Sequence, residues 1–84
     1  MVTEVYIHGI PLWLLREYLE ELGGTAESET VVNGDGWRAE LARLPDKQLG
    51  SLRVGRVELT LRGEAEALDR LRPGLDRKTL RAGA

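Results

Sequence analysis

The first hydrophobic pattern in the chain has a period of two residues and covers residues 3–8. This alternation is typical of a β-strand with one buried face. The side chains expected on the buried face are Thr3, Val5 and Ile7. The side chains expected on the opposite, helix-free face are Glu4, Tyr6 and His8.

The next pattern has the period of a helix and covers residues 11–22. Pro11 suits the first helical position, because the N–H that it lacks would have no partner there. Gly23-Gly24 is expected to end the helix, since glycine readily adopts the left-handed conformation found at helix ends. The apolar side chains fall within an arc of about 120°: Leu12, Leu15, Tyr18, Leu19 and Leu22. We expect a sheet to cover this face.

A hairpin is predicted in the middle of the chain. The polar segment 25–32 is expected to form a strand near an edge of the sheet. The turn is Asn33-Gly34-Asp35-Gly36, whose residue types tolerate the positive φ that a tight hairpin needs. In the following strand, residues 37–44, alternation places Trp37, Ala39 and Leu41 in the core.

The last strand and the second helix are predicted from residues 45–75. Pro45 is expected to end the preceding strand, and residues 52–62 form the next one. The apolar pattern of that strand changes parity, and a bulge at Gly55-Arg56 would restore a single buried face. A short helix over residues 64–72 follows, with Pro73-Gly74 at its end. Its buried side chains are expected to be Ala65, Leu68, Leu71 and Leu75.

These elements predict one α+β domain over residues 1–75 and a basic C-terminal tail over residues 76–84. The order β-α-β-β-β-α favours a two-layer sandwich, with a mainly antiparallel four-stranded sheet and both helices on one face. The opening β-α-β-β resembles a ferredoxin-like layout, and the fourth strand departs from it. The tail carries Arg77, Lys78 and Arg81 and is expected to be loosely attached or ordered by a partner.

Composition narrows the classes of function. The chain has 84 residues, no cysteine and a net charge of −2, and this charge argues against a nucleic-acid partner. No apolar run approaches the roughly 20 residues that a membrane-spanning helix needs, so we expect no membrane association and a cytoplasmic location. The chain has ten arginines and two lysines, ten glutamates and four aspartates, but one asparagine and one glutamine. Many charged and few thermolabile residues are a composition seen in heat-adapted proteins. The preference for arginine over lysine is equally compatible with a GC-rich genome.

No catalytic, nucleotide-binding or metal-binding motif is recognisable, so we expect no enzyme activity, no cofactor and no metal site. One candidate ligand site lies at the start of the first helix, which lacks a side-chain cap. There His8 and the amides of Leu12 and Trp13 would bind a small anion. The alternative is a solvated helix end beside a surface histidine.

A second candidate is a protein interface. Trp13 lies outside the leucine arc, and an exposed aromatic side chain often marks an interface. The predicted open face of the sheet, where cross-strand Arg–Glu pairs are expected, would add Tyr6, Arg38 and Glu58. The alternatives are a Trp13 side chain folded over its own helix and a solvated sheet face. The leading hypothesis is therefore a non-enzymatic protein that self-associates or binds another protein, and the competing one is a regulatory module for an anionic ligand.

Overall fold

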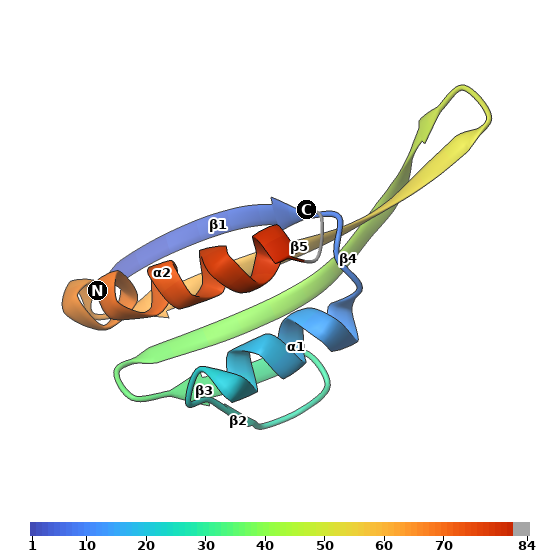
Figure 1. The fold of residues 1–84 in the computed structure, drawn as a ribbon. Coiled ribbons are helices and arrows are strands. Elements are labelled where there is room, and N and C mark those ends of the chain that lie inside the picture. Colours follow the sequence, from blue (N-terminus) through green and yellow to red (C-terminus); the bar gives the residue numbers. More distant parts are fainter. Residues whose placement is uncertain (82–84) are drawn as a thin grey trace.

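A computed structural model describes residues 1–81, apart from the side chains of Val54 and Arg81. Its two helices lie on one face of an antiparallel sheet, as the sequence predicts (Figure 1). The α+β class is therefore confirmed. In chain order the elements are β1 (Val2–His8), α1 (Leu12–Glu21), β2 (Thr25–Ala26), β3 (Val31–Gly34), β4 (Trp37–Leu49), β5 (Leu52–Gly63) and α2 (Ala65–Arg81).

Within residues 1–81 the sheet has five strands in the order β1-β5-β4-β3-β2, so the prediction of four strands is wrong. The difference arises in segment 25–32, which folds into two strands instead of one. The backbone turns after Ala26, where the Glu27 amide donates to the Val31 carbonyl at 2.8 Å. Strands β2 to β5 then follow one another without an intervening helix, so the ferredoxin-like layout is not confirmed.

The predicted hairpin between β3 and β4 is confirmed. Gly34 pairs with Trp37 across a two-residue turn. Gly36 has a φ of 81°, a conformation that favours glycine over any residue with a Cβ. Asp35 and Gly36 therefore fix the register that turns Trp37, Ala39 and Leu41 into the core.

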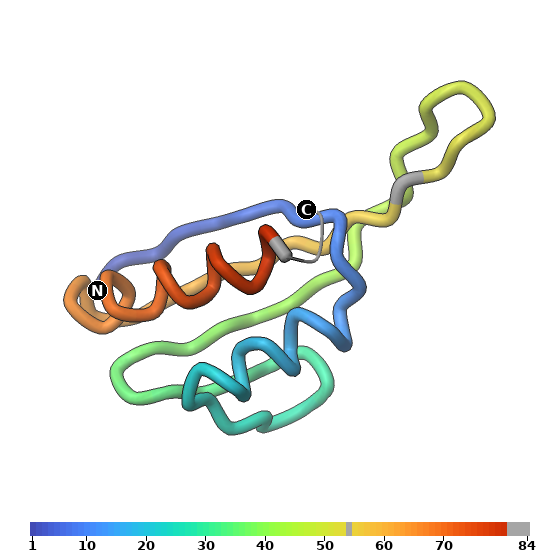
Figure 2. The backbone as a smooth tube through the Cα atoms, in the orientation of Figure 1, coloured from blue at the N-terminus to red at the C-terminus, as the bar shows by residue number. Residues whose placement is uncertain are grey.

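Strands β4 and β5 extend beyond the sheet as a two-stranded arm, which we define as residues 45–53 (Figure 2). Pro45 does not end β4, because it lies in a bulge between Leu44 and Lys47, where the ladder is interrupted. The extra residue is thus on β4, and the bulge predicted at Gly55-Arg56 of β5 is wrong. Gly50, with a φ of 61°, begins the two-residue turn at the tip.

The hydrophobic core lies between the helices and the sheet. Leu15 and Leu19 of α1 meet Leu59 and Leu61 of β5 and Leu68 of α2, and all five are fully buried. Trp37 closes one end of the core and is only 8% exposed, as predicted.

Two glycines make room for the Trp37 ring. A Cβ at Gly34 would lie 1.9 Å from the Trp37 Cε2 atom. A Cβ at Gly24 would lie 2.7 Å from its Cη2 atom and 2.4 Å from Val32 Cγ1. Gly24 and Gly34 therefore have a packing role besides their part in the turns.

Helix α2 continues through Pro73 to Arg81, so the predicted end at Pro73-Gly74 is wrong. The helix persists because its apolar stripe continues: Leu75 and Thr79 are both buried beyond the proline. Residues 76–81 of the predicted tail are thus helical, and residues 82–84 lie outside the described part of the chain. Lys78 binds Glu21 of α1 and lies 5.5 Å from the centre of the Tyr18 ring.

The two faces of β1 are the reverse of the prediction. Tyr6 pairs with Leu59 and Glu4 with Leu61, so Glu4, Tyr6 and His8 face the helices with the core residues of β5. Val5 and Ile7 instead lie on the open face, where they are 57% and 51% exposed. The charged Glu4 side chain can face the helices because its carboxylate forms an ion pair with Arg72 of α2.

Candidate functional site

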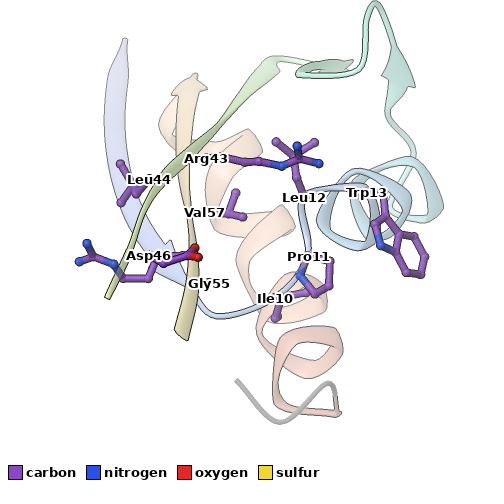
Figure 3. Close-up of a pocket in the computed structure, with 10 residues that line it drawn as sticks. Ile10, Pro11, Leu12, Trp13, Arg43, Leu44, Asp46, Gly55 and Val57 are labelled. Carbon is purple, nitrogen blue, oxygen red and sulfur yellow. The ribbon is translucent and has the colours of Figure 1, made fainter. Parts of the chain in front are cut away.

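A pocket of about 260 Å³ lies between the start of α1 and the base of the arm (Figure 3). On one side it is lined by residues 10–13, which lead into the first turn of α1. On the other side it is lined by residues 43, 44 and 46 of β4 and by residues 55–57 of β5. The residues are Ile10, Pro11, Leu12, Trp13, Arg43, Leu44, Asp46, Gly55, Arg56 and Val57.

The floor of this pocket is apolar and its rim is charged. Ile10, Leu12 and Val57 are buried core residues. Arg43 and Arg56 supply positive charge, and Asp46 supplies one negative charge. Arg56 is held in place because its Nη2 atom donates to the Pro45 carbonyl at 3.0 Å. Such a pocket suits an apolar group that carries a polar or acidic end.

The helix end beside the pocket lacks a side-chain cap, as expected from the sequence, but α1 begins at Leu12 and not at Pro11. Pro11 is the N-cap residue, and no side-chain hydrogen bond caps α1. The carbonyl of Pro11 accepts hydrogen bonds from the amides of Leu14 and Leu15, at 3.0 and 3.1 Å. The first amides of α1 are therefore left to solvent or to a ligand.

Trp13 borders this pocket and is 53% exposed, so the predicted exposure is confirmed. The arm, which begins on the other side of the pocket, adds two more exposed apolar residues at its tip. Leu49 is 53% exposed and Leu52 is 68% exposed. The arm projects away from the start of α1, so its tip lies apart from the pocket (Figure 2). We call Trp13, the pocket and the projecting arm together the arm surface.

His8 is not part of this pocket, although Leu12 and Trp13 are. Its ring lies under α2 and stacks on the Tyr6 ring, with centroids 6.3 Å apart. The Nε2 atom of His8 is buried and has no hydrogen-bond partner in the part of the chain that the structure describes. The structure therefore separates His8 from Leu12 and Trp13, the other two residues predicted to bind an anion.

A hydrogen-bonded cluster joins β1 to α2. The Glu4 carboxylate accepts bonds from Arg72 Nε at 2.9 Å and Nη2 at 2.6 Å, and from the Tyr6 hydroxyl at 2.6 Å. Arg72 also donates to Asp69 at 2.7 Å. The bonds from Arg72 and then Tyr6 hold the pKa of Glu4 below its usual value, and the bond to Glu4 raises the pKa of Tyr6. This cluster fixes α2 over β1.

We expect the free energy of unfolding to decrease as the pH falls from about 7.5 to about 5.5. Burial lowers the pKa of His8 below 6.5, although Asp76 partly opposes the change. The unfolded chain therefore binds a proton at a higher pH than the folded protein, which favours unfolding below pH 6.5. Urea unfolding at the two pH values measures this effect. His8→Gln should flatten the dependence, and an unchanged slope in that variant would contradict the role of His8.

The remaining predicted interface residues do not share one surface. Tyr6 is partly buried under α2, whereas Arg38 and Glu58 lie on the open face of the sheet. Arg38 binds Glu27 at 3.3 Å, and Arg62 binds Glu40 across the strands at 3.5 Å, as expected for an Arg–Glu pair. Trp13 lies on the opposite side of the sheet from these residues.

The arm and the strands at its base contribute pocket residues that the sequence pattern did not predict. Arg43, Asp46 and Arg56 reach the pocket only because β4 and β5 cross the start of α1 before they leave the sheet. One feature of the sequence does indicate the arm: Leu49-Gly50-Ser51-Leu52 has a two-residue turn between apolar residues, as in a hairpin. Pro45 favoured a different interpretation, because proline usually marks the end of a strand and not a position within a continuous one.

Some kinds of site are absent from the described residues. Within residues 1–81, no group of three or more His, Asp or Glu side chains is placed to hold a metal ion. None of the helices in that range is long and apolar enough to cross a membrane.

The fold and the pocket define a small α+β domain with a projecting two-stranded arm. A family model described as archaeal MoaD-like protein matches residues 3–84, almost the whole chain. The chain therefore belongs to the archaeal MoaD-like family. A comparison with curated proteins finds no match.

Proposed function

We propose that this protein is not an enzyme and acts by binding another protein through the arm surface. The observation that carries the proposal is an apolar pocket bordered by the exposed Trp13, from which an arm projects with two exposed apolar side chains at its tip, Leu49 and Leu52. Large apolar side chains exposed beside a pocket and on a projecting element are typical of binding surfaces.

The charges of the arm surface favour an acidic partner. Arg43, Lys47, Arg53 and Arg56 outnumber Asp46, whereas the chain as a whole has a net charge of −2. A partner segment with apolar side chains between acidic ones would fill the pocket and pair with these arginines. Complementary charge of this kind raises the rate of association and helps to fix the orientation of the complex.

The proposal is tested by affinity capture from the native host, followed by titration of the purified partner. We expect wild type and the matched control Leu80→Ser to retain the same protein. The double variant Leu49→Ser/Leu52→Ser and the variant Trp13→Ala should each bind it at least about tenfold more weakly, a loss of about 1.4 kcal/mol. Capture of no specific protein, or equal binding by all variants, would contradict the proposal.

A second candidate is a small anionic ligand in the same pocket. The supporting observations are Arg43 and Arg56 on its rim and the uncapped start of α1. The site would use Leu12 and Trp13 from the original hypothesis and these arginines in place of His8. A rise in melting temperature with phosphate that Arg43→Ala abolishes would favour this candidate, and its absence would leave protein binding as the function.

A further inference from the structure

The two edges of the sheet differ in how well they are protected against pairing with another strand. At one edge β2 has only two residues and runs into the polar turn after Ala26. Short edge strands of this kind discourage pairing between molecules. At the other edge β1 has seven residues in an uninterrupted register with β5. β1 contains no proline, lysine or bulge, and is therefore the less protected edge.

The outer side of β1 has free backbone groups. Within residues 1–81, no backbone hydrogen bond joins β1 to any segment other than β5. The exposed side chains on its open face are Thr3, Val5 and Ile7, all β-branched and well suited to a strand. Unpaired backbone groups next to exposed apolar side chains are a template for a further strand.

We infer that a second copy of this chain pairs with β1 in antiparallel orientation, with Val5 opposite Val5 at the two-fold axis. This interaction goes beyond the proposed function, because it uses the edge of the sheet and not the arm surface. The two sheets would join into one sheet with the helices of both copies on the same face.

The amino-acid order of β1 favours this register. With Val5 at the centre, all seven residues of each strand are paired, and Thr3 lies opposite Ile7 and Glu4 opposite Tyr6. A register centred on Glu4 would place two carboxylates directly opposite each other, which is unfavourable. A register centred on Tyr6 would pair only residues 4–8. A shift by one residue would exchange the two faces of the strand.

The charges on α2 are also complementary across this axis. Arg72 lies over Glu4, and Asp76 lies near enough to His8 to affect its pKa, so α2 and β1 run in the same direction. The two-fold axis through Val5 reverses the helix of the second copy. Arg72, which also binds Glu4 and Asp69 of its own copy, would thereby lie toward the Asp76 end of the helix in the other copy.

The first test measures the oligomeric state by native mass spectrometry and light scattering. We expect wild type to be a dimer and Val5→Lys to be a monomer at the same concentration, since the variant sets two positive charges together at the axis. Val5 is 57% exposed, so the circular dichroism spectrum and melting curve of the monomer should remain those of a folded protein. Thr25→Lys on the other edge is the matched control and should stay a dimer.

A second test determines the register. The wild-type chain has no cysteine, so Val5→Cys introduces a single thiol per copy. Opposite Cβ atoms in an antiparallel pair lie about 4.5–5.5 Å apart, so oxidised glutathione should produce a covalent dimer of Val5→Cys but not of Thr25→Cys. A monomeric wild type, a dimer that persists in Val5→Lys, or equal cross-linking of both cysteine variants would overturn the inference. None of these outcomes depends on the arm surface.

Discussion

Replacing Trp37 by alanine should lower the free energy of unfolding by about 3–5 kcal/mol. The Trp37 side chain is only 8% exposed and closes one end of the core. Gly24 and Gly34 lie so close to its ring that neither has space for a Cβ. Their backbones cannot readily collapse into the cavity that alanine would leave, so most of the lost contacts would not be replaced. Urea denaturation measures the change.

Trp13→Ala is the matched control for this experiment. Trp13 is 53% exposed and belongs to the arm surface and not to the core. We expect its loss to change the free energy of unfolding by less than about 1 kcal/mol. Comparable losses for Trp13→Ala and Trp37→Ala would contradict the assignment of one tryptophan to the surface and the other to the core.

Leu75→Ala should lower the free energy of unfolding by about 2–5 kcal/mol. Leu75 lies in α2 beyond Pro73 and is only 3% exposed. The variant therefore tests whether the part of α2 after the proline belongs to the cooperative core. Thermal and urea unfolding provide the measurement.

Leu80 provides the control in the same part of α2. It is 72% exposed, so Leu80→Ala should change the free energy of unfolding by no more than about 0.5 kcal/mol. If Leu75→Ala also changed the free energy of unfolding by no more than about 0.5 kcal/mol, the part of α2 after Pro73 would not contribute to the core. That result would agree with the helix end that the sequence pattern predicts.

Local signals in the sequence predict part of this fold well. The periodic leucines of α1, the glycines after it and the Asp35-Gly36 turn each act within a few residues of the chain. Their effects on conformation therefore do not depend on distant partners. The same local reasoning correctly places Trp37 in the core and Trp13 at the surface.

The errors arise where a distant partner decides the outcome. The faces of β1 could not be assigned from alternation alone, because both sets of side chains include apolar groups. Arg72, far along the chain, makes Glu4 acceptable beneath α2. In the same way, Leu75 and Thr79 extend the buried stripe that carries α2 past Pro73. A proline predicts a helix end, but continued packing can outweigh the hydrogen bond that it removes.

Only the part of the candidate site at the start of α1 could be predicted from the sequence, because the rest depends on strands that are distant in the chain. Leu12 and Trp13 are adjacent in sequence to the uncapped start of α1, and that end could be located directly. Arg43 and Arg56 come from two strands that pair with each other and cross near it. Their position depends on the register of β4 and β5, which the bulge at Pro45 alters.

The arm also has a consequence for how motion is distributed in the molecule. Over residues 45–53 each strand has only the other as a neighbour within the described part of the chain, where no third strand or helix buries a face of the arm. A lone two-stranded ribbon is marginally stable in water. Its amide protons should therefore exchange with solvent through local opening, long before those of Leu59 or Leu61 in the same strand. A partner bound at the arm would slow this exchange there first. Hydrogen exchange would then detect the binding as protection of the backbone amides of the arm.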